Sequence, residues 1–139
     1  MVNYYLKNMV RYWKTFVKLV VHRCWNFGKC WTEITVDELF ESFNSNKPPL
    51  ILDIRSVQEF NGAVGHIPNA RSIPIMELKS NFEDLQSYKD KEIITICPGG
   101  GMSMIAVELL EEAGFTDAKS LHGGLDLWVE KGYPITTTS

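Results

Sequence analysis

The chain has 139 residues, of which 45% are hydrophobic and 22% are charged, so it fits one globular domain of ordinary size with some chain left over. The net charge of -3 is unevenly distributed, because the first 32 residues hold six basic residues and no acidic one, while the remainder carries -9. Three cysteines are too few for a dense disulfide framework and favour a reducing compartment. Basic residues also interrupt the first segment before it reaches the roughly 18 apolar residues that a membrane span needs.

The change in charge near Thr32 to Ile34 marks a domain boundary. We expect a basic, aromatic-rich helical extension over residues 1–33, a folded domain over residues 34–135 and a polar tail over residues 136–139.

The first segment has the pattern of a basic amphipathic helix. At about 100° per residue, apolar side chains that include Trp13 fall on one face, and Lys7, Arg11, Lys14 and Lys18 gather on the opposite face. Aromatic side chains suit the interfacial zone of a bilayer, and basic side chains favour anionic headgroups. We therefore expect these five residues to contact an anionic membrane surface or a partner, and the protein to be cytoplasmic and peripheral at the inner face of the membrane.

Other fates of this helix remain open, and packing of its apolar face carries about equal weight with membrane contact. Its apolar face would also suit packing on the folded domain or on a second chain. An organelle-targeting presequence is a further alternative, although such segments are usually richer in Arg and Ser. Nucleic-acid binding is least favoured, because the rest of the chain is acidic and has no binding motif. His22, Cys24 and Cys30 lack the paired close spacing of a zinc site, so we expect no metal and no cofactor.

The folded domain begins with two helix starts. Thr35 with Glu38, and Ser56 with Glu59, have the spacing of a capping box, in which each side chain accepts a hydrogen bond from the backbone of the other residue.

Strands and helices alternate along the rest of the domain. Short apolar runs predict buried strands over residues 50–54, 92–96 and 118–121. Apolar residues at helical spacing, each time followed by glycine, predict helices over residues 103–113 and 124–131. This order indicates an α/β fold with a parallel sheet covered by helices on both faces. In such sheets, ligands bind beyond the carboxyl ends of the strands.

Cys97 follows one of these strands and opens a glycine-rich loop. Three consecutive glycines allow positive φ angles, so that successive N–H groups can converge on one point, and the next helix adds the positive end of its dipole. Such a loop would stabilise a thiolate or persulfide anion, which would make Cys97 the catalytic nucleophile. A buried structural cysteine before a flexible turn is the alternative. The residues that we expect to bind the substrate are Gly99, Gly100, Gly101, Met102 and Ser103.

Several short segments occur in a recognisable order: Leu52-Asp53-Ile54-Arg55 with Glu59-Phe60, Gly65-His66-Ile67-Pro68-Asn69-Ala70 with Ile73-Pro74, Cys97, Ala113-Gly114-Phe115, Gly123-Gly124, Trp128 and Gly132-Tyr133-Pro134. This set resembles the rhodanese (sulfurtransferase) family. The resemblance implies a rhodanese-like parallel sheet and a persulfide cycle. In that cycle Cys97 takes a sulfane sulfur from a small donor and passes it to a thiol, to cyanide or to a protein acceptor such as a sulfur-relay protein.

The loop departs from the family at Met102, where many active rhodaneses have arginine, and no Lys or Arg lies between Cys97 and Ser103. The missing charge-assisted contact, worth roughly 1.5–3 kcal/mol, implies weak turnover of the thiosulfate dianion. The leading hypothesis is a sulfurtransferase, and the alternative is a catalytically weak or silent binding module recruited by its N-terminal helix. A phosphatase or arsenate reductase is less favoured, because the loop is shorter than in the related phosphatases and lacks their arginine.

Other polar residues have supporting or structural roles in this hypothesis. Asp53 and Arg55, near the end of the first long strand, either support the site or form a structural pair. His66 and His122 belong to turns in the family pattern, and we expect structural hydrogen bonds from both. Cys24 or Cys30 would attack the persulfide on Cys97 and relay its sulfur if the first segment folded back onto the domain.

Overall fold

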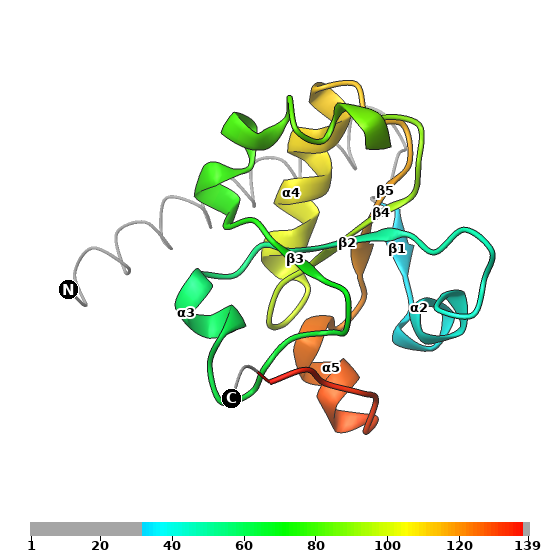
Figure 1. Ribbon diagram of the computed structural model, residues 1–139, viewed down its shortest axis with the longest axis vertical. Coiled ribbons are helices and arrows are strands. Elements are labelled where there is room, and N and C mark those ends of the chain that lie inside the picture. Colours follow the sequence, from blue (N-terminus) through cyan, green and yellow to red (C-terminus); the bar gives the residue numbers. More distant parts are fainter. Residues whose placement is uncertain (1–31, 138–139) are drawn as a thin grey trace, which may run out of the picture. The chain divides into compact units, whose positions relative to one another are not determined.

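The computed structural model describes residues 32–137, which form a five-stranded parallel sheet in the order β1-β5-β4-β2-β3 (Figure 1). The strands are β1 (Glu33–Ile34), β2 (Leu50–Asp53), β3 (Arg71–Ser72), β4 (Ile93–Ile96) and β5 (Ala118–Leu121). The helices are α2 (Val36–Ser42), α3 (Val57–Phe60), α4 (Gly101–Glu112) and α5 (Gly124–Glu130). Three short 3₁₀ helices, η1 (Ile75–Glu77), η2 (Lys79–Asn81) and η3 (Gln86–Tyr88), connect β3 to β4.

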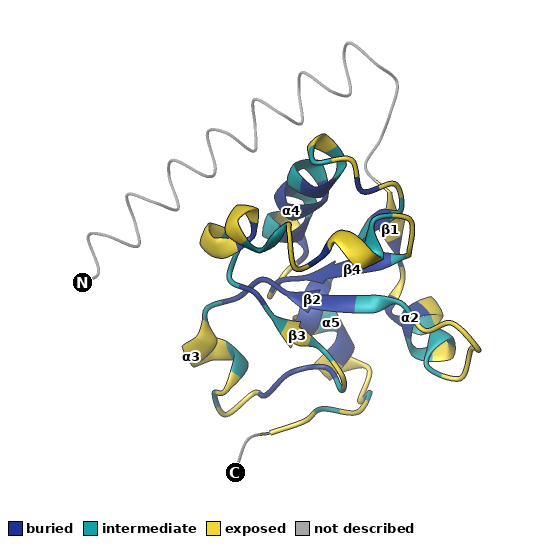
Figure 2. Cartoon of the chain, turned by 45° about the horizontal axis from the view of Figure 1, so that its top comes forward, coloured by how far each residue is buried: buried dark blue, intermediate teal, exposed yellow. Residues whose placement is uncertain are grey.

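A hydrophobic cluster covers each face of the sheet, and Figure 2 shows β2 and β4 buried between the layers. The side chains of β4 alternate between the two faces, as a strand requires. Ile93 and Cys97 lie in the cluster beneath α4, whereas Ile94 and Ile96 lie in the cluster with α2 and α5. The α/β class predicted from the sequence is confirmed. Cys97 therefore projects toward α4 from the carboxyl end of a central strand.

The predicted helix starts are confirmed at both capping boxes. Thr35 Oγ1 accepts a hydrogen bond from the Glu38 N–H at 3.2 Å, and Glu38 Oε2 accepts one from the Thr35 N–H at 2.9 Å. Ser56 and Glu59 repeat the arrangement at the start of α3, with distances of 3.2 Å and 3.0 Å. Each box satisfies backbone donors that the first helical turn leaves without partners.

Other boundaries differ from the prediction. The helix expected from residue 103 begins at Gly101, because Gly100 adopts a left-handed conformation with φ of 92° and turns the chain directly into α4. Strands β1 and β3 were not predicted, since two residues carry no periodic pattern. The same holds for the 3₁₀ helices between β3 and β4.

The N-terminal amphipathic helix lies outside the described residues apart from Thr32 and Glu33, and Glu33 begins β1. Its proposed contact residues, Lys7, Arg11, Trp13, Lys14 and Lys18, are all outside this range. Within residues 32–137, no helix is long and apolar enough to cross a membrane.

Candidate active site

Cys97 is the residue directly after β4, and its side chain is 2% exposed. Its sulfur accepts a hydrogen bond from the Gly100 N–H at 3.0 Å. Gly100 is also the residue that precedes α4, so the positive end of the helix dipole lies at the same place. A backbone donor and a helix N-terminus both favour negative charge on Cys97 Sγ.

The three glycines of the loop are not equivalent. Gly100 has a φ of 92°, in the left-handed region that glycine adopts without steric cost, whereas Gly99 and Gly101 do not have positive φ. A Cβ at Gly99 or Gly101 would meet nothing within 4 Å. The expectation that the triplet as a whole provides positive φ angles is therefore wrong, and Gly100 alone performs that role.

Gly124, the first residue of α5, lies close to the backbone of the Cys97 loop. Its φ is 62°, and a Cβ there would lie 2.4 Å from the Cys97 carbonyl oxygen and 2.7 Å from the Gly100 nitrogen. The backbone N–H groups of Leu125 and Asp126 donate to the carbonyl oxygens of Cys97 and Pro98, each at 2.9 Å. The loop and α5 are thus in backbone contact. The sequence shows the glycine at position 124, but it did not predict that this residue contacts the Cys97 loop.

Two buried serines form the floor beneath Cys97. The Cys97 thiol donates to Ser103 Oγ at 3.5 Å, and Ser103 Oγ lies 2.6 Å from Ser120 Oγ. Ser103 also donates to the Gly100 carbonyl oxygen at 2.9 Å. Ser103 therefore contacts Cys97 Sγ from the buried interior of the domain. Ser120, on β5, was missed in the sequence because it is 17 residues from its partner.

Met102 is partly buried and packs against the hydrophobic cluster that contains Cys97. It gives the loop an apolar neighbour at the position where a cation would bind a dianion. The sequence between Cys97 and Ser103 contains no charged side chain.

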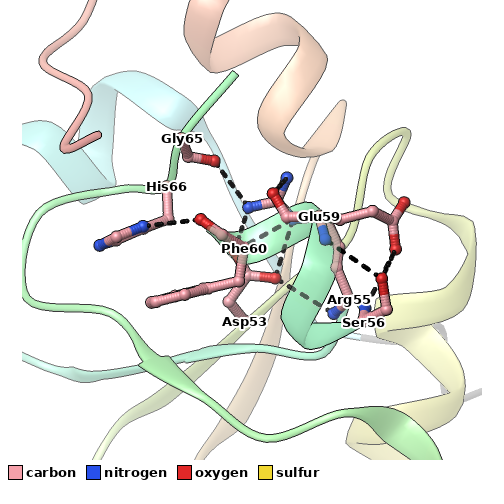
Figure 3. Close-up of polar contacts among 7 residues, drawn as sticks. All are labelled: Asp53, Arg55, Ser56, Glu59, Phe60, Gly65 and His66. Carbon is pink, nitrogen blue, oxygen red and sulfur yellow. Dashed lines mark hydrogen bonds and ion pairs between the residues drawn. The ribbon is translucent and has the colours of Figure 1, made fainter. Parts of the chain in front are cut away.

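Asp53 and Arg55 form a buried ion pair at the neighbouring strand end (Figure 3). Arg55 Nε lies 2.9 Å from Asp53 Oδ1, and Arg55 Nη2 lies 2.7 Å from Asp53 Oδ2, so the contact is bidentate. Arg55 Nη2 also donates to the Gly65 carbonyl oxygen at 2.8 Å, and Nη1 donates to that of Glu59 at 3.4 Å. Asp53 is 1% exposed and Arg55 is 7% exposed. The pair is electrically neutral and ties three segments of chain together.

The hydrogen bonds of the His66 and His122 side chains are with Phe60 and Glu33, and not with Cys97. His66 Nδ1 lies 3.0 Å from the Phe60 carbonyl oxygen, and its ring stacks on that of Phe60 with centroids 3.7 Å apart (Figure 3). His122 is exposed and its Nδ1 lies 3.3 Å from a carboxylate oxygen of Glu33. The expected structural hydrogen bond is present at both histidines.

A pocket of about 290 Å³ lies beside the Cys97 loop. It is lined by Arg55, Glu59, Gly62, Ala63, Val64, Pro98, Leu125 and Asp126. Among these lining residues Arg55 is the one cationic side chain, and Asp53 neutralises it. The carboxylates of Glu59 and Asp126 remain, so the pocket has negative character and disfavours a dianion.

Metal ligands do not gather in the described part of the chain, where no three His, Cys, Asp or Glu side chains are close enough to hold an ion. His22, Cys24 and Cys30 lie outside that part.

The fold and this site define a class of small α/β domains in which a cysteine ends a central parallel strand and enters a loop capped by a helix. The model of the Rhodanese-like domain matches residues 35–131, and the chain belongs to this family.

Relatives and solved structures agree with this membership. The Zea mays protein named adenylyltransferase and sulfurtransferase MOCS3-1 is 32% identical over 110 residues, which are 73% of this chain and 23% of that protein. The chain thus spans about a quarter of the length of this relative. A crystal structure of a rhodanese-related protein from Thermoplasma volcanium has 31% identity and a TM-score of 0.68, covering 78% of this chain and all of the other. The human single-domain sulfurtransferase TSTD1 has 28% identity and a TM-score of 0.63, covering 73% and 98%.

Proposed function

We propose that this domain is a sulfurtransferase that carries a sulfane sulfur on Cys97. The observation that carries the proposal is the placement of Cys97 Sγ, 3.0 Å from the Gly100 N–H at the start of α4. Membership of a family whose relatives include named sulfurtransferases supports it.

The reaction has two balanced half-reactions. The Cys97 thiolate attacks the outer sulfur of a donor R–S–SH, a new S–S bond forms, and the donor leaves as R–S⁻. An acceptor thiolate or cyanide then attacks the outer sulfur, the bond to Cys97 breaks, and the Cys97 thiolate is restored. No external oxidant or reductant is needed. Cys97 Sγ is anionic as nucleophile and again as leaving group, so the loop assists both steps by stabilising that charge.

The loop and its pocket favour a donor other than thiosulfate. Gly99, Gly100 and Gly101 would bind the transferred sulfur through the backbone, and Met102 offers an apolar contact. Among the described residues that line the loop and its pocket, none offers a free cation. The persulfide group of a low-molecular-weight thiol or of a partner protein carries at most one negative charge, whereas thiosulfate carries two on its four atoms around the central sulfur, so a persulfide suits this site better. A Bacillus subtilis relative, 28% identical over 99 residues, is named a putative sulfur carrier protein, which supports a protein partner in sulfur relay.

Transfer of sulfur from glutathione persulfide to cyanide, measured as thiocyanate, tests the function. We expect turnover with the full chain, little turnover with thiosulfate, and none with Cys97→Ser. A matched control is Cys30→Ser, because direct transfer of sulfur from glutathione persulfide to cyanide through Cys97 does not use this thiol, and a fall in its turnover would instead indicate the relay through Cys30. Equal turnover in Cys97→Ser and the unaltered chain would refute the proposal.

A catalytically silent binding module is the second candidate. The observations that favour it are the cation-free loop, with Met102 in place of arginine, and the 2% exposure of Cys97. This candidate predicts no thiocyanate from any donor, together with a retained fold.

The N-terminal segment belongs to the proposal as a membrane or partner contact, supported by its amphipathic pattern alone. At the inner face of the membrane, anionic headgroups would bind the basic side chains Lys7, Arg11, Lys14 and Lys18, and Trp13 would lie in the interfacial zone. Co-sedimentation with liposomes should then require anionic lipid. Binding that survives deletion of residues 1–30 would contradict this role.

A further inference from the structure

The floor beneath Cys97 contains a pair of hydroxyl groups that are sealed from solvent. Ser103 and Ser120 are both 0% exposed, and their Oγ atoms are 2.6 Å apart. Ser103 Oγ also lies 2.9 Å from the Gly100 carbonyl oxygen and 3.5 Å from Cys97 Sγ. Because the pair is fully buried, its hydrogens must be shared among these few atoms.

Counting hydrogens leaves two arrangements when Cys97 is a thiol, because either serine can donate to the other. The arrangement in which Ser120 donates to Ser103 is favoured, because it places a hydrogen in the short 2.9 Å contact between Ser103 Oγ and the Gly100 carbonyl oxygen. Each serine has one hydrogen, and two hydroxyls at 2.6 Å share one hydrogen bond. If Ser120 donates to Ser103, then Ser103 donates to the Gly100 carbonyl oxygen, and the thiol hydrogen points at Ser103 Oγ. Every hydrogen then has an acceptor. The weaker Ser120 contact with that carbonyl oxygen, at 3.4 Å, competes little with the short one.

A thiolate changes this count, because Cys97 Sγ loses its hydrogen and becomes an acceptor. The Ser103 hydrogen is the one nearby that rotation of a single bond can redirect, from the Gly100 carbonyl oxygen to the sulfur. That carbonyl precedes α4 and accepts the first backbone bond of the helix, so it tolerates the loss. Ser120 keeps donating to Ser103, which strengthens Ser103 as a donor through cooperative polarisation.

We propose that Ser103 and Ser120 form a hydroxyl switch under Cys97, in which Ser103 donates its hydrogen to the sulfur whenever Cys97 Sγ is anionic and to the Gly100 carbonyl when it is not. Ser103 is a catalytic residue, since it touches the reacting atom. Ser120 is a positioning residue that acts through Ser103. The inference rests on the proposed function for its place in the cycle, where the sulfur alternates between thiolate and persulfide.

Alkylation of Cys97 by iodoacetamide tests the switch without any sulfur donor, so its result is independent of whether sulfur transfer occurs. Mass analysis of the peptide that contains Cys97 separates this thiol from those of Cys24 and Cys30. At neutral pH we expect Ser103→Ala to react about tenfold more slowly and Ser120→Ala about threefold more slowly. At alkaline pH, where all the thiol is ionised, the rates should converge with that of the unaltered chain.

Thr95→Val is the matched control. The Thr95 hydroxyl is also buried and bonds the carbonyl oxygens of Ser103 and Lys119, at 2.9 Å and 3.2 Å, yet it donates nothing to Cys97. We expect its pH profile of alkylation to remain unchanged. The charged groups at the carboxyl ends of the strands stay the same in all variants: Asp53 with Arg55, Glu59, Asp126, and His122 with Glu33. The pair of Lys119 with Glu92, farther from the loop along β5 and β4, is also unaltered.

The double variant Ser103→Ala with Ser120→Ala should react no more than about twofold more slowly than Ser103→Ala alone, because Ser120 acts through Ser103. An unchanged profile in Ser120→Ala would overturn its positioning role. A loss of rate that is equal at every pH, or equal in Thr95→Val, would overturn the switch. If Ser103→Ala fails to fold, Ser120→Ala decides the question, since it leaves α4 unaltered.

Discussion

The loop after β2 and the loop after β4 leave adjacent strands at the same edge of the sheet, yet they are held together differently. Asp53, the last residue of β2, and Arg55, two residues later, form a bidentate ion pair that is almost fully buried. Cys97, after β4, is bonded to a backbone N–H and a buried hydroxyl, and the hydrogen bonds of its sulfur within residues 32–137 involve no charged side chain. The loop after β2 uses charge for structure, and the loop after β4 receives charge in the proposed reaction.

This difference shows that a cation beside a site is not necessarily available to a substrate. Arg55 lines the pocket, but its donors are directed at Asp53 and at two carbonyl oxygens. Met102 supplies no replacement in the Cys97 loop. The site therefore relies on dipoles, which suits a transferred sulfur better than a dianion.

Breaking the ion pair should give the largest effect on stability. Arg55→Met leaves the Asp53 carboxylate buried without a partner, and we expect a loss of about 3–5 kcal/mol in the free energy of unfolding by urea. Arg71→Met, which removes an exposed arginine, is the control and should cost within about 0.5 kcal/mol. Equal losses in the two variants would mean that Arg55 is not a structural cation.

Gly124→Ala tests the backbone contact that shapes the Cys97 loop. Its Cβ would lie 2.4 Å from the Cys97 carbonyl oxygen, so the loop must move, and we expect sulfur transfer to fall by about 100-fold. Gly132→Ala is a matched control, because Gly132 also has a positive φ, of 74°, but has free space around it. It should cost about 1 kcal/mol of stability and no activity. Similar activity in both variants would contradict the role of Gly124.

Met102→Arg would make the Cys97 loop resemble that of many active rhodaneses. We expect thiosulfate:cyanide sulfurtransferase activity to rise about tenfold, because the guanidinium adds a charge-assisted contact to the dianion. Met102→Leu, of similar size and no charge, should leave that activity unchanged. A rise in neither variant would show that charge does not limit thiosulfate turnover.

The partly exposed ion pair of Asp37 with Lys131 should give the smallest effect on stability, in contrast to the buried pair of Arg55 with Asp53. Hydrogen bonds from Lys131 and then Tyr133 lower the pKa of Asp37 below its ordinary value of 3.8. The stabilisation is therefore present above that value and is lost as the pH falls through the lower pKa of the folded state. Asp37→Asn should lower the melting temperature slightly at neutral pH and not at about pH 2. A difference that persists in acid would argue against this pair as its source.

The sequence was informative wherever the cause of structure is local. Capping boxes at Thr35 and Ser56, and the apolar runs of the three longer strands, predicted their elements because each depends on near neighbours. The contacts that shape the site join distant residues. Gly124 contacts the Cys97 loop, and Ser120 forms its hydrogen bond with Ser103. Both contacts form only when β4 and β5 pair. The spacing of Asp53 and Arg55 allowed a pair but did not show that the pair is buried.

Intact-mass measurement after incubation with a persulfide donor, followed by mapping of the modified peptide, tests the role of Cys97 most directly. We expect a gain of about 32 Da, one sulfur atom, on the peptide that contains Cys97, removed by a thiol acceptor and absent in Cys97→Ser. A gain that persists in Cys97→Ser, or no gain with any donor on a folded chain, would contradict Cys97 as the sulfur carrier.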